Sequence, residues 1–274
     1  MAQFGKALLF GLVQGITEWL PVSSTGHMIL LRRLLHPEVS DAFYELFQVV
    51  IQLGSVLAVA VLYFDRLVPF SASQGREQRR RTLQMWGRIL ISMLPLGAVG
   101  LLLDDVIEAR FYNEITVAVM LIVYGVLFLL AEKLRRGRSP TVMTPEQLDG
   151  RRALGLGLFQ ALAVIPGTSR SGATILGGLL LGLARPLAAE YSFFMAIPVM
   201  AGAGGLKAVK YLRTAPTLSA AETVFLITGT ATAFLVSMAV VRFLVGYLQR
   251  HDFRVFGIYR ILLGFLTLFI FSRT

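Results

Sequence analysis

The sequence contains no cysteine and only three histidines, and charged residues make up 15% of its 274 residues. The lack of cysteine excludes disulfides and thiolate metal sites, and three histidines leave little for a histidine-rich metal cage. A soluble domain typically carries about 25% charged residues. With so few charges to wet its surface, the chain is not expected to be a soluble globular enzyme.

Apolar residues, by contrast, are abundant: they make up 55% of the chain, and the mean hydropathy is +0.69. This content excludes intrinsic disorder. The 26 Lys and Arg outnumber the 16 Asp and Glu, which in a soluble protein would suggest nucleic-acid binding. Here the positive charges form short clusters between long apolar runs, which is typical of the cytoplasmic loops of membrane proteins. The composition therefore predicts a polytopic protein of the bacterial inner membrane with no nucleic-acid partner.

Six apolar stretches approach the roughly 20 residues that a membrane-spanning helix needs. They are residues 43–64, 89–103, 115–131, 191–206, 224–247 and 255–271. The second stretch is short and follows Trp86 and Arg88, so we expect that helix to begin earlier.

Two further apolar regions, 7–35 and 153–184, are interrupted by the polar strings 21–27 and 166–172. Each half is too short to cross a membrane, and proline and glycine break the helix. Irregular backbone at membrane depth is tolerated only where protein or a water-filled cavity surrounds it. Both regions are therefore predicted to be re-entrant helical hairpins.

Positive charge is concentrated in two connecting regions and acidic charge in the one between them. The basic residues are Arg66, Arg76, Arg79, Arg80, Arg81 and Arg88, then Lys133, Arg135, Arg136, Arg138, Arg151 and Arg152; the acidic ones are Asp104, Asp105, Glu108 and Glu114. The positive-inside rule places the two basic regions in the cytoplasm.

The two broken regions resemble each other at an offset of 146 residues. The polar and glycine matches are Gln14 with Gln160, Ser23 with Ser169 and Gly26 with Gly172. A hairpin followed by three spans leaves the second half inverted, and inverted repeats place a site near the midplane. The predicted fold is an all-α polytopic membrane protein in one integral domain. Repeat 1 covers about 1–131, a cytoplasmic linker about 132–152, and repeat 2 about 153–274.

The repeat fails at the positions that carry chemistry. The mismatched pairs are Glu18 with Val164, Ser24 with Arg170, and His27 with Ala173. One half thus supplies a carboxylate and an imidazole, and the other a guanidinium. Because ionisable groups within membrane segments are costly, they indicate function, and we expect one composite site.

In the first hairpin, Gln14 and Glu18 lie four residues apart and share a helix face. Their oxygens could hold Mg²⁺ or Ca²⁺ together with water and substrate phosphate; alternatively, Glu18 only braces the loop. Ser24 or His27 could attack or activate water, with the other group moving the proton. Ser23, Thr25 and Gly26 are predicted to contact substrate, although one of the serines could simply cap the following helix.

In the second hairpin, Arg170 lies among small polar residues just before a helix. Arginine binds phosphate through paired charge-assisted hydrogen bonds, and a helix N-terminus with hydroxyls favours anions. We therefore expect substrate contacts from Ser169, Ser171 and Thr174, and we assign Arg170 as the one positive charge with a catalytic role. The alternative is a structural ion pair between Arg170 and Glu18.

Weaker signals lie outside the hairpins. Gln48 and Gln52 share one face of the span 43–64 and could line a substrate cavity or join helices. Glu190 could pair with a neighbouring arginine, and Tyr191, Tyr247 and Tyr259 are candidates for interfacial anchors.

Two long motifs now identify a resemblance. Gln14-x-x-x-Glu18 followed by LPVSSTGH at 20–27, and PGTSRSGAT at 166–174, resemble the undecaprenyl pyrophosphate phosphatases, or bacitracin-resistance proteins. The similarity extends through FQVVIQLGS at 47–55 and EYSF at 190–193. In this family the position of Gln14 holds either Glu or Gln.

The resemblance implies hydrolysis of undecaprenyl pyrophosphate to undecaprenyl phosphate and inorganic phosphate. It also implies a divalent cation and a site open to the periplasm, in contact with inner-membrane lipids. This activity recycles the lipid carrier for cell-wall synthesis and gives bacitracin resistance. A rival prediction is a lipid-phosphate flippase that uses the same anion groove, because inverted repeats with broken helices are typical of transporters. The sequence leaves the oligomeric state, including a homodimer, open.

Overall fold

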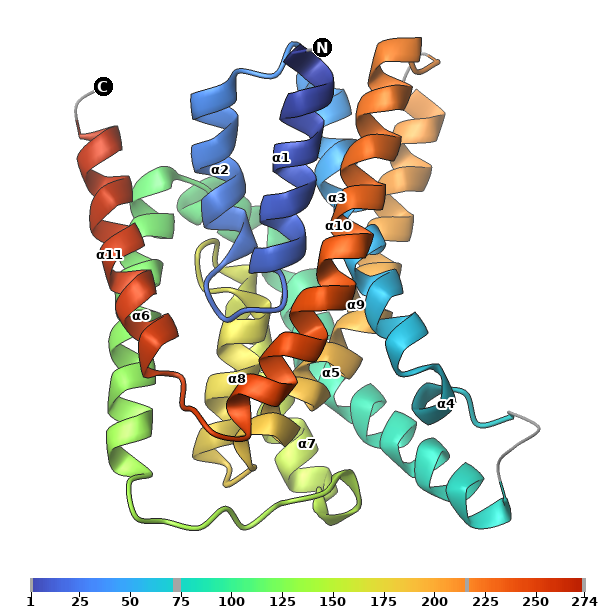
Figure 1. The fold of residues 1–274 in the computed structure, drawn as a ribbon, viewed down its shortest axis with the longest axis vertical. Coiled ribbons are helices and arrows are strands. Elements are labelled where there is room, and N and C mark those ends of the chain that lie inside the picture. Colours follow the sequence, from blue (N-terminus) through green and yellow to red (C-terminus); the bar gives the residue numbers. More distant parts are fainter. Residues whose placement is uncertain (1, 71–74, 215–216, 273–274) are drawn as a thin grey trace.

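The computed structural model describes residues 2–70, 75–214 and 217–272, and its regular structure is helical (Figure 1). The membrane-length helices are α3 (Asp41–Leu62), α5 (Arg76–Phe111), α6 (Glu114–Leu134), α9 (Arg185–Thr214), α10 (Ala220–Leu248) and α11 (Arg254–Phe271). The shorter helices are α1 (Ala2–Thr17), α2 (Ser24–Leu35), α4 (Phe64–Leu67), α7 (Gly150–Ala161) and α8 (Arg170–Leu180), with 3₁₀ turns at Pro145–Gln147 and Leu162–Val164. The all-α polytopic fold is confirmed.

All six predicted spans correspond to helices that are long and apolar enough to cross a membrane. The second begins at Arg76, earlier than the apolar run, as expected. It also continues to Phe111, so most of the predicted acidic connection is helical. The side chains of Asp104, Asp105 and Glu108 lie outside what the structure describes.

The two broken regions form the expected helix–loop–helix hairpins. Helices α1 and α2 enter from one end of the molecule and α7 and α8 from the other, so that both loops lie near mid-height (Figure 1). We call the end that holds the start of α5 and the linker 135–149 the arginine-rich end.

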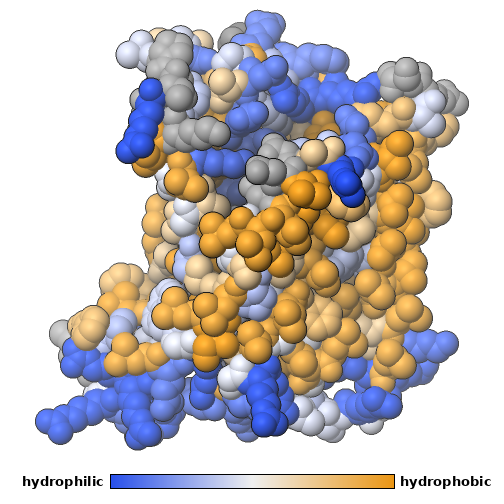
Figure 2. Space-filling view, turned by 180° about the vertical axis from the view of Figure 1, so that it is seen from behind, coloured by the Kyte–Doolittle hydropathy of each residue, from blue (hydrophilic) through white to orange (hydrophobic). Residues whose placement is uncertain are grey.

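The surface between the two ends is apolar. Figure 2 shows a broad hydrophobic band with hydrophilic side chains gathered above and below it. Large apolar residues on this surface include Leu101, Leu235, Leu262 and Phe265, all more than half exposed. Because such a surface needs a hydrocarbon solvent, the protein is a multi-pass membrane protein.

The outer helices of the hairpins pack closely on long spans: α1 on α10 and α7 on α5. A Cβ on Gly11 of α1 would lie 2.5 Å from the carbonyl oxygen of Gly229, and one on Gly157 of α7 would lie 2.4 Å from that of Ser92. Small residues allow such helix contacts in membranes. Gly11 and Gly157 occupy equivalent positions at the offset of 146, so both hairpins use the same packing device.

Two apolar clusters hold the first hairpin against neighbouring helices. Phe10 of α1 packs edge-on against Tyr44 and Phe47 of α3. Trp19, in the first loop, is fully buried and meets the ring of Phe193 of α9 edge-on, with centroids 5.1 Å apart. The Phe10 contacts thus hold α1 against α3, and the Trp19 contact holds the first loop against the helix that follows the second hairpin.

The predicted partner of Glu190 is Arg66, whose Nη1 lies 3.0 Å from Oε1 of the carboxylate. The anchor role predicted for Tyr191 is wrong, because that side chain is 1% exposed within the core. Tyrosines at a membrane interface keep one end wet, and Tyr191 does not.

Candidate active site

Both loops end in a serine with an unusual backbone. Ser23 has φ 72° and Ser169 has φ 69°, a left-handed region that non-glycine residues rarely adopt. Each serine caps the helix that follows, accepting a hydrogen bond from the backbone N–H of Gly26 at 3.4 Å and of Gly172 at 3.1 Å, respectively. The capping role is therefore confirmed, and Ser23 rather than Ser24 performs it.

This division leaves Ser24 free for chemistry. Its hydroxyl donates to Oε2 of Glu18 at 2.8 Å, and Nε2 of Gln14 donates to the same oxygen at 2.9 Å. The other oxygen, Oε1, accepts from Nη2 of Arg170 at 3.2 Å. Glu18 thus collects a hydroxyl and an amide from its own hairpin and a guanidinium from the other.

The Glu18–Arg170 pair is buried: the side chains are 4% and 10% exposed. Two charges removed from water this far are retained only when both are paired and hydrogen-bonded. Nη1 of Arg170 also donates to the carbonyl of Ser192 at 2.8 Å, whereas its Nε has no partner among the described residues. The Nε–H of the guanidinium is therefore available to donate a hydrogen bond to a ligand.

Two other buried polar groups of the loops also lack partners within the described part of the chain: Nε1 of Trp19 and the hydroxyl of Thr168. The Arg170 guanidinium lies over the Trp19 ring, 5.8 Å from its centroid. Buried donors without partners are rare and call for an unseen water or ion. An anion beside Arg170 and Trp19 would offer an acceptor to both side chains.

The hydroxyls of the second hairpin are already engaged. Ser171 donates to the backbone carbonyl of Glu18 at 3.1 Å, so it joins the loops. Thr174 shares a 2.5 Å hydrogen bond with Ser192, and Ser169 lies 3.2 Å from the Ser171 hydroxyl. In this conformation these hydroxyls hydrogen-bond to other groups of the protein and so stabilise the loops.

His27 does not contact Ser24 through either ring nitrogen. Its Nδ1 lies 2.7 Å from the carbonyl of Ser23, and its Nε2 lies 2.7 Å from the hydroxyl of Tyr259. Because a carbonyl only accepts, Nδ1 carries a proton; when the ring is neutral, Nε2 accepts from the hydroxyl of Tyr259. Tyr259, predicted as an interfacial anchor, therefore holds the histidine.

The remaining predicted substrate residues are less connected to this cluster. Gly26 is buried, and a Cβ there would lie 3.3 Å from Leu121; Thr25 is half-buried. Gln48 and Gln52 lie half-buried on α3, and Gln48 interacts with Tyr44. Within the described residues, no hydrogen bond joins these four positions to Glu18 or Arg170.

Sequence reasoning missed Arg260, a fully buried residue of α11. Its guanidinium donates to the carbonyls of Pro21, Gly167 and Thr168, at 3.1, 2.9 and 2.9 Å. It therefore fastens both hairpin loops at once. The available signal was a lone charge inside the apolar run 255–271.

The donor set around Glu18 fits a divalent cation only in part. Glu18 is one carboxylate, with the Gln14 amide and the Ser24 hydroxyl beside it. Among the described residues, no cluster of three or more His, Cys, Asp or Glu exists. Mg²⁺ is commonly bound by one or two carboxylates together with water and substrate phosphates. These residues would therefore fit a cation that arrives with a phosphorylated substrate.

Comparison with known proteins identifies the family. Residues 7–266 match the family described as bacitracin resistance protein BacA. The chain belongs to this family. Three similar proteins are named undecaprenyl-diphosphatase. The protein of Desulfitobacterium hafniense is 49% identical over 99% of this chain and 97% of its own length. That of Acetivibrio thermocellus is 48% identical, covering 99% and 98%, and that of Enterococcus faecalis 47%, covering 96% and 95%.

The BacA match covers both hairpins and Arg260. The cluster described above therefore lies within the part of the chain that matches the family.

Proposed function

We propose that the chain hydrolyses undecaprenyl diphosphate to undecaprenyl phosphate and inorganic phosphate. The activity is that of the named relatives in the BacA family. It would recycle the lipid carrier for cell-wall synthesis in the bacterial inner membrane and give bacitracin resistance. One observation carries the proposal: a buried carboxylate and a buried arginine from opposite hairpins meet beside donors that have no partner in the described part of the chain.

We assign Ser24 as the nucleophile, because its hydroxyl lies 2.8 Å from a carboxylate that can accept its proton. A nucleophile and its base must lie within hydrogen-bond reach. Ser24 Oγ would attack the terminal phosphorus, and the bond to the bridging oxygen would break. Undecaprenyl phosphate leaves with that oxygen, and water then cleaves the phosphoserine, releasing inorganic phosphate and restoring Ser24.

Arg170 would bind the diphosphate and stabilise charge that develops on the bridging oxygen, since positioned donors are strongest in a site that excludes water. The ion pair with Glu18 would open to admit the substrate, freeing the guanidinium for bidentate contact. His27, held by Tyr259, would supply or remove the proton in the second step. Ser23, Thr25, Gly26, Ser169, Ser171 and Thr174 would shape the loops around the phosphates, with Gln48 and Gln52 lining the approach.

Gln14 and Glu18 would hold Mg²⁺ or Ca²⁺ jointly with the substrate. Such a cation, when bound, neutralises part of the diphosphate charge. The paired glycines, Gly11 and Gly157, and the paired serine caps support an inverted repeat of two hairpin-plus-three-span halves. With the arginine-rich end in the cytoplasm, the first hairpin would enter from the periplasm, and the substrate would reach the site from that side.

Phosphate release from a short-chain polyprenyl diphosphate, measured with detergent-purified protein and Mg²⁺ or Ca²⁺, tests this assignment. Ser24→Ala and Glu18→Gln should each lower kcat by about 10²–10⁴-fold. Ser55→Ala is the matched control, because among the described residues that buried hydroxyl bonds only to the carbonyl of Ile51; it should keep at least half of the activity.

Full activity in Ser24→Ala would overturn the nucleophile assignment and leave His27 in that role. A wild-type protein that releases no phosphate but moves lipid across vesicle membranes would overturn the phosphatase proposal in favour of a flippase. The family names do not favour that alternative.

A further inference from the structure

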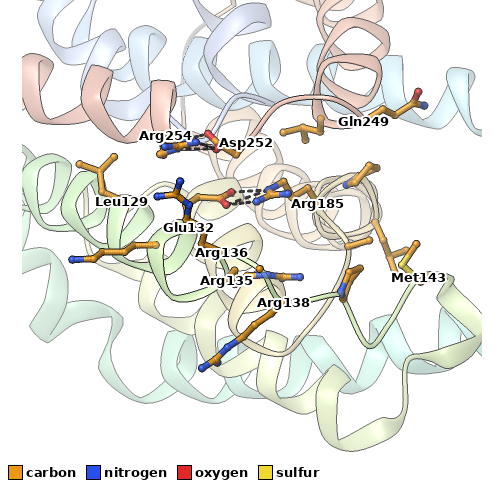
Figure 3. Close-up of a pocket in the computed structure, with 17 residues that line it drawn as sticks. Leu129, Glu132, Arg135, Arg136, Arg138, Met143, Arg185, Gln249, Asp252 and Arg254 are labelled. Atoms are coloured by element: carbon orange, nitrogen blue, oxygen red, sulfur yellow. Dashed lines mark hydrogen bonds and ion pairs between the residues drawn. The ribbon is translucent and has the colours of Figure 1, made fainter.

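A polar cavity lies at the arginine-rich end, away from the two hairpin loops. It has a volume of about 870 Å³ and lies between the ends of α6 and α10, the starts of α9 and α11, and the linker 135–149 (Figure 3). Its charged lining residues are six cations and two carboxylates, namely Lys133, Arg135, Arg136, Arg138, Arg185, Arg254, Glu132 and Asp252. Four positive charges therefore remain without a counter-charge in the wall.

Both carboxylates are already committed. Glu132 accepts from Nε of Arg185 at 2.9 Å, and Asp252 accepts from Nε of Arg254 at 2.7 Å (Figure 3). Glu132 also accepts from the backbone N–H of Phe253 at 3.1 Å. The hydrogen bonds from Arg254 hold the pKa of Asp252 below its usual value. Neither acid is therefore available to the other cations of the cavity.

Three of the cations have no such partner. Lys133, Arg136 and Arg138 are exposed, and their side chains make no hydrogen bond or ion pair within the described residues. Arg135 instead donates to the carbonyls of Leu179 and Leu183, both at 2.7 Å. Burial and the nearby charge of Arg185 lower its pKa. Like charges are thus crowded together, and a bound anion would relieve the repulsion.

The wall of the cavity is built by backbone hydrogen bonds. The N–H groups of Thr141 and Val142 donate to the carbonyl of Gly182, and that of Ala184 donates to the carbonyl of Val142. The N–H of Met143 donates to Oε1 of Gln147 at 2.6 Å. The linker is therefore fastened to the turn between α8 and α9, and its arginines have a defined place beside the cavity.

Apart from Gln249, the rest of the lining has no polar side chain, and it favours a lipid over a free ion. Leu129, Met143, Pro186, Leu187 and Leu248 line the same cavity as the cations. Free phosphate has no apolar part that could pack against such a surface. A lipid phosphate group could bind the cations while its chains lie along the apolar flank of α6, where Leu130 and Leu134 are exposed.

We propose that this cavity binds the phosphate headgroup of an anionic membrane lipid. Basic pockets between spans on the cytoplasmic side are suited to such headgroups. The site needs no catalytic step and does not depend on the proposed phosphatase activity, so the two proposals fail independently.

Native mass spectrometry of the purified full chain, titrated with short-chain phosphatidylglycerol, tests the proposal. Arg136→Gln/Arg138→Gln should weaken the apparent Kd about tenfold or more. The matched control is Arg76→Gln/Arg80→Gln, which removes two arginines from α5 at the same end that have no ion pair among the described residues; its Kd should stay within twofold of wild type. Phosphatidylcholine should bind at least tenfold more weakly than phosphatidylglycerol.

Equal weakening in both double variants would overturn the proposal in favour of nonspecific charge attraction. Displacement of the lipid by millimolar inorganic phosphate would also overturn it, because the cavity would then be a free-anion site. Should the pocket double variant fail to fold, Lys133→Gln is the second test; its apparent Kd should rise about fivefold, and an unchanged value would count against the proposal. The phosphate-release activity of all three variants should match wild type.

Discussion

The two re-entrant hairpins share a backbone but not a chemistry. Each has an outer helix packed through glycine, a loop, and a serine cap at positive φ, Ser23 or Ser169. The first hairpin then presents Glu18 and Ser24, whereas the second presents Arg170. The backbone arrangement is thus repeated, whereas the reacting groups are divided between the two hairpins. The carboxylate comes from one loop and the guanidinium from the other, and they meet at the centre.

Arg260 lies outside both hairpins yet depends on both. It binds Pro21 of the first loop and Gly167 and Thr168 of the second through their carbonyls. Because arginine presents five donors in a fixed fork, one side chain can fasten loops that come from opposite ends. Removing Arg260 should therefore disturb both hairpin loops at once.

The largest expected effect follows from Arg260→Met. It leaves at least three buried carbonyls without donors, which should cost about 3–5 kcal/mol of stability and abolish phosphate release. Equilibrium unfolding in mixed micelles measures the first, and a phosphate assay the second. Arg260→Lys should rescue little of either, because a lysine cannot reproduce the fork; full rescue by lysine would show that charge alone matters.

The sequence predicted the helices and hairpins far better than it predicted the contacts that hold them in place. The six spans and two hairpins follow from apolar length and from the Pro-Gly interruptions, because the bilayer leaves few alternatives for backbone polar groups. Glu18, Ser24 and Arg170 stand out as charges or hydroxyls at the breaks, and the structure brings them together.

The contacts that hold these groups depend on tertiary packing, which periodicity does not contain. Tyr259 looked like an anchor, but it bonds to His27, 232 residues away in sequence. Ser192 looked like part of an apolar span, but its carbonyl accepts from Arg170. Neither partner could be read from spacing, since each contact joins helices that meet only in the folded chain.

A smaller loss of stability is expected when the Glu18–Arg170 ion pair is broken. Glu18→Leu or Arg170→Met alone leaves an unpaired buried charge and should destabilise by about 3 kcal/mol, whereas the double variant should recover at least half of that loss. Activity should stay absent in all three. Equilibrium unfolding of the four proteins gives the coupling energy.

A double variant whose losses simply add would show that the two hairpins are not coupled through this pair. Recovered activity in the double variant would remove both groups from the proposed chemistry. The control pair is Arg66→Gln with Glu190→Gln, which breaks a more exposed ion pair between α4 and α9 and should change stability by about 1 kcal/mol or less.

The smallest effect tests whether the two turns are equivalent. At Ser23 and Ser169, alanine removes the cap but keeps a Cβ at positive φ, whereas glycine removes the cap and relieves the backbone. At each site, the free energy of unfolding of the alanine variant should therefore be about 1 kcal/mol lower than that of the glycine variant. The difference should agree between the hairpins within about 0.5 kcal/mol, measured by equilibrium unfolding of the four single variants. A difference at one serine only would mean that the matching φ values arise from separate constraints, and the repeat would then extend to packing but not to the turns that carry the site.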